Sequence, residues 1–253
     1  MRYLISKMSG DGQHHADYQC KHYKRNCKYI APCCDQVYMC RVCHDDKETH
    51  EMDRKQVKEV LCLKCQTKQK FQQTCEKCGG MFGKYCCNIC HLLDNEDKQQ
   101  FHCDKCGICR VGGQENFFHC EKCDICLANN LKDNHKCVEK VSHDSCPICL
   151  DFLHTSRRDL SIPPCGHLLH RDCFNNLLQS GNYACPVCNQ SLVKMDEVWE
   201  NVDEEIANTQ MPDEYKDMDV DILCRDCHKD SNIKWHVLGL KCSHCGSYNT
   251  CRK

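Results

Sequence analysis

Thiols and imidazoles are the side chains of this sequence that could do chemistry. The chain of 253 residues contains 31 cysteines and 16 histidines. Most of the cysteines occur as C-x-x-C pairs with histidines between them, which is the spacing of tetrahedral zinc sites. An odd number of cysteines also fits disulfide pairing poorly. The spacing therefore predicts a series of structural zinc sites.

The densest pattern lies between Cys146 and Cys188, where two C-x-x-C pairs flank a C-x-H-x-x-H-x-x-C centre. Four ligands fill one closed site, so eight ligands predict two zincs. A segment of about forty residues buries too little apolar surface to fold alone, and metal binding supplies the missing free energy. A short helix is expected over 170–178. The eight predicted ligands are Cys146, Cys149, Cys165, His167, His170, Cys173, Cys185 and Cys188.

This pattern resembles a RING finger of the two-histidine kind. The resemblance implies a cross-brace in which alternate ligand pairs share a zinc. The first zinc would be held by Cys146, Cys149, His170 and Cys173, and the second by Cys165, His167, Cys185 and Cys188. It also implies a surface that binds a ubiquitin-conjugating enzyme, formed by Ile148, Leu177, Pro186 and Val187. The alternative is that these side chains only pack between the zinc loops.

Asn189 follows the last of these cysteines. In many efficient RING ligases the matching residue is Arg or Lys, which bonds to both ubiquitin and the conjugating enzyme. An amide has no charge and a shorter reach. The resemblance therefore predicts a weaker ubiquitin contact at Asn189, or help from another part of the chain. The alternative is that this residue faces solvent.

The N-terminal half begins with a string, CKHY…APCCDQVYMCRVCHDD…H, that closely resembles the CHY zinc finger. By this resemblance one zinc would be held by Cys20, His22, Cys40 and Cys43, and another by Cys33, Cys34, His44 and His50. Two further C-x-x-C pairs predict a third site, formed by Cys62, Cys65, Cys75 and Cys78. Cys27 is left over and is expected to be a small buried residue.

An internal repeat follows, with FHCDKCGIC at 101–109 and FHCEKCDIC at 118–126, and an earlier degraded copy, YCCNICH, at 85–91. A fixed period indicates that each unit shares zinc with its neighbour. The segment resembles the CTCHY zinc finger, which implies three zincs. Three zincs need twelve ligands, so one of thirteen candidates, expected to be a histidine, is surplus. The candidates are Cys87, Cys90, His91, His102, Cys103, Cys106, Cys109, His119, Cys120, Cys123, Cys126, His135 and Cys137.

Beyond the RING-like segment, residues 195–207 carry apolar residues at helical spacing and six acidic residues. This helix either packs its apolar stripe on a neighbouring module or docks a substrate or a second copy of the chain. A zinc ribbon is predicted next, paired across an expected hairpin at 233–242, and Cys251 remains as a free thiol. The ribbon ligands are Cys224, Cys227, Cys242 and Cys245.

Composition excludes several classes of protein. The N-terminus has no continuous apolar segment typical of a signal peptide, and no run of 18 apolar residues could span a membrane. Abundant thiols then favour a reducing compartment, the nucleus and cytoplasm. The formal net charge is −2, with 34 Lys and Arg against 36 Asp and Glu. This balance does not favour nucleic-acid binding.

The order of these patterns resembles the RING-and-CHY zinc-finger E3 ubiquitin-protein ligases. The implied fold is a small metal-stapled multi-domain protein with little regular secondary structure and about nine zincs. The implied function is direct transfer of ubiquitin from a conjugating enzyme to substrate lysines, with the other modules recruiting substrates such as transcription factors for proteasomal degradation. The rival classes are a non-catalytic adaptor and a nucleic-acid-binding zinc protein. The expected order is a flexible N-terminus (1–19), a CHY finger (20–79), a CTCHY finger (80–138), the RING (146–189), an acidic helix or linker (195–210) and the ribbon (220–251).

Overall fold

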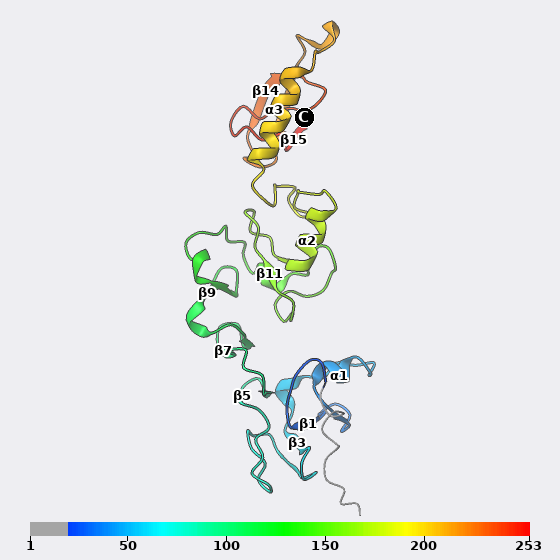
Figure 1. Ribbon diagram of the computed structural model, residues 1–253, viewed down its shortest axis with the longest axis vertical. Coiled ribbons are helices and arrows are strands. Elements are labelled where there is room, and N and C mark those ends of the chain that lie inside the picture. The colour runs from blue at the N-terminus through cyan, green and yellow to red at the C-terminus, as the bar shows by residue number, and fades with distance from the viewer. Residues whose placement is uncertain (1–19) are drawn as a thin grey trace, which may run out of the picture. The chain divides into compact units, whose positions relative to one another are not determined.

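The computed structural model describes residues 20–253, so the predicted flexible N-terminus, 1–19, lies outside the described residues (Figure 1). The chain divides into two compact units between Asn116 and Phe117. Regular elements are short in both: the longest strand described has six residues and the longest helix thirteen. The predicted fold class, a set of metal-stapled modules with little regular structure, is confirmed. None of the described helices has the length and apolar character needed to cross a membrane.

The first unit contains one four-stranded antiparallel sheet, in the order β2-β1-β3-β4. Its core residues come from both sides of the predicted CHY boundary, because Phe82 and Leu93 pack with Tyr29, Val57 and Val60. A hydrogen bond from a side chain to the backbone also joins these parts: the Tyr29 hydroxyl donates to the His91 carbonyl at 2.7 Å. The elements are β1 (Cys27–Ile30), β2 (Val37–Tyr38), α1 (Arg41–Asp45), the 3-10 turn Arg54–Gln56, β3 (Glu59–Cys62) and β4 (Lys68–Lys70).

The repeat predicted from sequence forms three small hairpins. Each copy pairs a strand that enters a C-x-x-C turn with a strand that leaves it. The unit boundary falls between the second and third copies, inside the predicted CTCHY finger. The hairpins are β5 (Tyr85–Cys87) with β6 (Leu92–Asp94), β7 (Phe101–Cys103) with β8 (Ile108–Arg110), and β9 (Phe117–Cys120) with β10 (Ile125–Ala128); the 3-10 turns Gln114–Asn116 and Asn129–Leu131 follow the second and third.

The C-x-x-C turns share one backbone geometry. In the turn that starts at Cys62, the N–H of Gln66 donates to the Cys62 carbonyl at 3.0 Å, and Gln66 has φ of +55°. A left-handed residue at this point reverses the chain and brings the two thiols of the pair to the same side. The same bond is made by residues of several types, Gly79, Gly107, Leu150, Asn189, His228 and Gly246.

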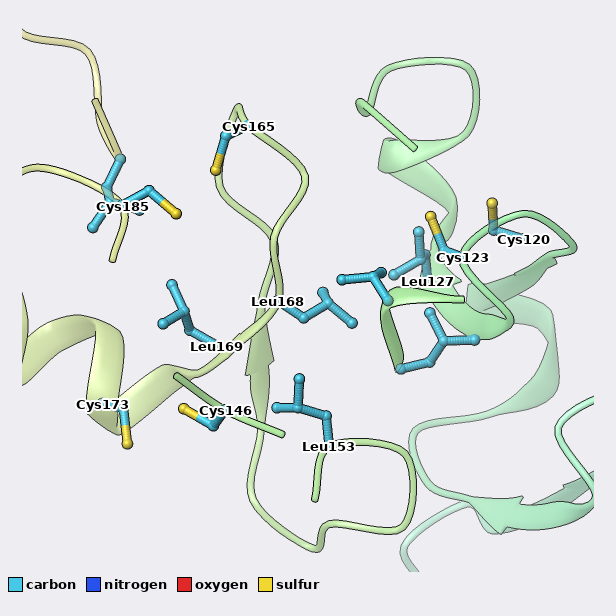
Figure 2. Packing of buried hydrophobic residues seen from close by; sticks show 13 residues of the cluster. Cys120, Cys123, Leu127, Cys146, Leu153, Cys165, Leu168, Leu169, Cys173 and Cys185 are labelled. Atoms are coloured by element: carbon cyan, nitrogen blue, oxygen red, sulfur yellow. The ribbon is translucent and has the colours of Figure 1, made fainter. Parts of the chain in front are cut away.

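The third hairpin and the RING segment share one hydrophobic core in the second unit. Figure 2 shows Leu168 pointing toward Leu127 of the hairpin, while the adjacent Leu169 points the other way, toward Cys173 and Cys185. The join expected at 138–145 is part of this core, because Val141 is only 2% exposed. The elements of this region are the 3-10 turn Val141–His143, β11 (Leu160–Ser161), β12 (Leu169–His170) and α2 (Arg171–Gln179), close to the predicted 170–178.

The acidic helix forms as α3 (Asp196–Asn208) and packs on its neighbours. The Trp199 ring lies 5.6 Å from that of Tyr183 in the RING and 5.8 Å from that of Tyr248 in the ribbon. Asp203 accepts hydrogen bonds from Lys241 Nζ and the Tyr248 hydroxyl. The contacts of Trp199 and Asp203 favour the first alternative, a helix packed on neighbouring modules.

The ribbon differs from its prediction in the position of its hairpin. The strands described are β13 (Asp219–Cys224), β14 (Asp230–Lys234) and β15 (Thr250–Arg252), in the order β14-β13-β15, with the 3-10 turn Asp213–Tyr215 before them. The expected hairpin at 233–242 is wrong, because the chain leaves β14 after Lys234 and passes Gly239 closely against the Tyr248 ring. Cys251 is half-buried in β15, and its thiol donates to the Leu223 carbonyl at 3.7 Å.

Two glycines of the second unit allow a matched test of its close packing. Gly166 and Gly181 have similar φ values, +87° and +82°, but a Cβ on Gly166 would lie 2.3 Å from the Lys136 carbonyl oxygen, whereas one on Gly181 would meet nothing within 4 Å. Gly181→Ala should cost about 1 kcal/mol from backbone strain. Gly166→Ala should cost about 1–3 kcal/mol more from overpacking. Thermal unfolding of both variants at equal zinc content checks this, and equal midpoints would contradict the close approach.

Candidate metal centres and docking surface

Four groups of cysteine and histidine side chains come together in the first unit. In each group the donor atoms all lie within 4.8 Å of one another. Three groups match the sets predicted for the CHY segment, and the fourth joins the first two copies of the repeat. The groups are Cys20, His22, Cys40 and Cys43; Cys33, Cys34, His44 and His50; Cys62, Cys65, Cys75 and Cys78; and Cys87, Cys90, His102 and Cys109.

The spacing of these donors fits zinc. A tetrahedral ion with Zn–S bonds of about 2.3 Å places two sulfurs about 3.8 Å apart. The Sγ atoms of Cys20 and Cys40 are 3.7 Å apart, and those of Cys62 and Cys78 are 3.8 Å apart. All the cysteines in the described residues are free thiols. The donor sets are therefore those of zinc sites, without competing disulfides.

The second unit brings together four of the candidate ligands from the last repeat and its C-terminal flank, and also the set predicted for the ribbon. Cys120 Sγ lies 3.7 Å from Cys137 Sγ, and His135 Nε2 lies 3.6 Å from Cys123 Sγ. In the ribbon the sulfur pairs are Cys224 with Cys245 and Cys227 with Cys242, both at 3.6 Å.

The RING segment pairs its ligands in the alternate order that the cross-brace requires. Cys149 Sγ lies 3.3 Å from His170 Nδ1, although 21 residues separate them. Cys185 Sγ lies 3.8 Å from His167 Nδ1 across 18 residues. The chain thus passes from one donor group to the other and back, which locks the short segment between them.

Four predicted ligands of the repeat fall in different units. Cys103 and Cys106 belong to the first, where the Cys106 N–H donates to Cys103 Sγ at 3.4 Å. His119 and Cys126 face one another across β9 and β10 in the second. Sharing of one zinc by these two pairs stays a prediction.

His91 departs from the predicted ligand set. The group formed by Cys87, Cys90, His102 and Cys109 does not contain it. Its ring stacks on Phe71 at 4.7 Å, and its φ is +44° because it occupies the left-handed position that ends a C-x-x-C turn. The surplus residue among the thirteen candidates is therefore a histidine in a structural position.

Burial opposes ionisation of the clustered thiols. Together with the neighbouring thiols, it raises the pKa of Cys43 and of Cys62 to about 12. A hydrogen bond with Cys165 lowers the pKa of Cys185 to about 5, so one thiolate of that group is stabilised at the expense of its neighbours. Several thiolates within 4 Å repel one another strongly unless a cation lies between them. Zinc, when bound, supplies that charge.

Polar groups that sequence reasoning missed surround the ligands. His44 Nδ1 lies 2.8 Å from Asp45 Oδ1, and His170 Nε2 lies 2.9 Å from Ser156 Oγ. Such bonds orient the imidazole and fix which nitrogen faces the metal. Asp45 follows its ligand directly, but Ser156 is 14 residues from His170, so only the fold could identify it.

Arg158 is the most connected of these missed residues. Its Nη1 donates to Cys149 Sγ at 3.2 Å and its Nη2 to Cys173 Sγ at 2.9 Å. The same guanidinium pairs with Asp172 at 2.7 Å and with Asp151 at 3.1 Å. Arg158 therefore stabilises two thiolates of the first RING group.

Three of the four predicted docking residues lie inside the C-x-x-C turns of the RING, and the fourth, Leu177, lies on α2. Ile148 is 40% exposed and Val187 54% exposed, and Pro186 is exposed beside it. Leu177 is half-buried and packs against the shared core. The alternative that these side chains only pack between the zinc loops therefore fits Leu177 better than it fits Ile148, Pro186 and Val187. Asn189 is exposed in its turn, with φ of +61°.

Comparison with known proteins agrees with this arrangement. Family models match at three places: a CHY zinc finger over 20–85, a RING finger domain over 144–189 and a zinc ribbon over 193–251. The E3 ubiquitin-protein ligase RZFP34 of Arabidopsis thaliana is 44% identical over 243 residues, which cover 92% of this chain and 84% of that protein. The chain belongs to the family of RING- and CHY-type zinc-finger ubiquitin ligases.

Other members of this family differ in length. The E3 ubiquitin-protein ligase SRFP1 of Oryza sativa subsp. japonica is 44% identical over 236 residues, covering 92% of this chain and 90% of that protein. The zinc finger protein BRUTUS of Arabidopsis thaliana is also 44% identical, over 92% of this chain but only 19% of its own length. The zinc-ribbon family model matches from residue 193, so the match includes α3. This agrees with the structure, where Trp199 of α3 packs against Tyr248 of the ribbon.

Loss of the Arg158 donors should weaken the first RING zinc site. Arg158→Gln should release zinc to a chelator about tenfold faster, because groups that bond to metal ligands commonly contribute 10- to 100-fold in metal affinity. Arg171→Gln, a change of an exposed arginine on the same RING, is the matched control. A colorimetric zinc indicator follows the release. Equal release rates from the two variants would contradict this role of Arg158.

Proposed function

We propose that this chain is a RING-type E3 ubiquitin ligase that binds a ubiquitin-loaded conjugating enzyme through Ile148, Pro186 and Val187, with the half-buried Leu177 of α2 as a fourth contact. The observation that supports this proposal most directly is the exposure of Ile148, Pro186 and Val187 on turns whose flanking cysteines are gathered into metal-binding groups. Exposed apolar side chains held on a rigid frame are suited to protein contact. Autoubiquitination with purified activating and conjugating enzymes is the direct test.

The proposed mechanism is positioning. A substrate lysine amine attacks the thioester carbonyl on the conjugating enzyme, the C–S bond breaks, and the enzyme's cysteine leaves as a thiolate. The ligase holds the reacting groups in an attack geometry, which lowers the barrier without a covalent intermediate on this chain. All the RING cysteines belong to donor groups, so none is needed as a nucleophile.

The remaining parts of the function are proposed on the same basis. We infer that the CHY, CTCHY and ribbon modules recruit protein substrates, transcription factors among them, and that the modified substrates are degraded by the proteasome. We infer a place of action in the nucleus and cytoplasm. Substrate turnover with and without a proteasome inhibitor, in cells that express the Ile148→Ala variant or the parent chain, tests this extension.

Nine zincs per chain are proposed. Three come from 20–78, three from 87–137, two from 146–188 and one from 224–245. Native mass spectrometry should find about nine zinc ions, since each closed site takes four ligands. His102→Ala should lower the count by one, whereas His91→Ala should leave it unchanged because His91 lies outside the donor group. A loss of zinc from the His91 variant would overturn this assignment.

Ile148→Ala should weaken binding of the conjugating enzyme while zinc content stays constant. The lost contact is worth about 1–3 kcal/mol, or roughly 5- to 150-fold in affinity. Val237→Ala, which trims an apolar residue that is 60% exposed in the ribbon, is the control. Calorimetric titration measures both, and equal affinities would place the docking surface elsewhere.

Asn189→Arg should speed the discharge of ubiquitin to free lysine. A charged donor forms stronger hydrogen bonds than an amide, and about 1 kcal/mol regained at the transition state gives roughly a three- to tenfold increase. The left-handed φ should tolerate arginine, since the matching turns carry Gln66, Leu150 and His228. Asn189→Gln is the uncharged control in a single-turnover assay. A rate that arginine leaves unchanged would mean that this position does not limit transfer.

A further inference from the structure

A hydrogen-bond network fastens the ribbon to the last zinc turn of the RING. The Asp226 carboxylate accepts from the Ser191 N–H at 2.7 Å and from the Ser191 hydroxyl at 2.9 Å. It also accepts from the Ser247 hydroxyl at 2.7 Å. Asn249 Nδ2 donates to the Asn189 carbonyl at 2.8 Å and lies 3.0 Å from Asp226 Oδ1.

This network is sheltered and directional. Ser191, Ser247 and Asn249 are each less than 10% exposed. Hydrogen bonds to a carboxylate are about twice as strong as neutral ones, and burial makes the loss of the acceptor costly. Asp226 therefore clamps the C-x-x-C turn of the ribbon, Cys224–Cys227, against the RING turn that carries Pro186 and Val187.

The clamp places Arg225 beside the proposed docking surface. The Arg225 N–H donates to the Asn249 carbonyl at 2.9 Å, and the Asn249 side chain reaches Asn189, so two hydrogen bonds link the two turns. Arg225 is half-buried, and its guanidinium makes no hydrogen bond or ion pair with any residue that the structure describes. A guanidinium has five N–H donors and stays charged at all physiological pH values. An unpaired cation at this seam is available to an acceptor on a bound partner.

We propose that the ribbon is part of the docking surface: Arg225 contacts the ubiquitin-loaded conjugating enzyme, and Asp226 is a positioning residue that holds Arg225 there. This inference rests on the proposed ligase function. The partner follows from continuity, because residues 185–189 carry both the apolar docking residues and the Asn189 carbonyl that the ribbon binds. The partner's contact should be a carboxylate or carbonyl oxygen, which suits a guanidinium.

The test uses the full chain and a stable, isopeptide-linked conjugate of a conjugating enzyme with ubiquitin. Arg225→Gln should weaken conjugate binding about three- to tenfold, the loss expected for one charged contact. Asp226→Ala should have a similar effect. The double variant should bind about as tightly as the weaker-binding single variant, because both changes remove the same contact. Lys234→Gln is the control, since Lys234 pairs with Asp219 at the end of β13 away from the clamp.

The outcomes separate this inference from the function on which it rests. Binding by Arg225→Gln that equals binding by Lys234→Gln would overturn the contact, and additive effects of Arg225→Gln and Asp226→Ala would overturn the clamp. If Asp226→Ala does not fold, Asp226→Asn, which keeps one acceptor oxygen, takes its place. Repeating the titration with the free conjugating enzyme shows whether ubiquitin or the enzyme meets Arg225. A parent chain that binds neither probe would overturn the proposed function itself. If Ile148→Ala weakens binding while Arg225→Gln and Asp226→Ala do not, only this inference is overturned.

Discussion

The structure depends on one recurring backbone turn that delivers two thiols to a metal. In the turns that begin at Cys62, Cys146 and Cys224, the N–H four residues on donates to the carbonyl of the first cysteine. That following residue is held at positive φ. Each turn presents both sulfurs on one side, and two turns, or a turn with histidines, complete a tetrahedral set. Because metal ligation supplies the folding free energy, helices and strands can remain only a few residues long.

The turns also explain why apolar residues lie exposed on the RING. A side chain between two ligands, such as Ile148 or Val187, is directed away from the metal by the ligand geometry and has no core to enter. The buried leucines come from elsewhere: Leu169 lies in β12, Leu168 directly precedes it, and Leu127 belongs to the neighbouring hairpin (Figure 2). The same framework that hides the metal ligands thus displays a rigid apolar contact surface.

The modules within each unit are less separate than their ligand patterns imply. Small metal-stapled domains still gain from burying apolar area against a neighbour, at about 25 cal/mol for each square ångström. Leu93 completes the core of the first unit, and Val141 that of the second. The ribbon is attached in a different way, through the Asp226 carboxylate and aromatic contacts of Trp199. Polar attachment specifies orientation more sharply than apolar contact does, because hydrogen bonds require defined geometry.

Ligand identity could be predicted from the sequence because zinc chemistry is local: residue type and short spacing decide which side chains can reach one ion. The helices at 171–179 and 196–208 were likewise predictable. The alternation of ligand pairs in the RING followed from the resemblance to the RING family. Only the tertiary structure decided that His91 stacks on Phe71 outside its ligand group, because nothing in the spacing separates it from a donor. Only the tertiary structure also placed Arg158 on two thiolates and Asp226 on Ser191. Those contacts join residues up to 35 positions apart, and they depend on how packed turns meet, which residue type and short spacing do not encode.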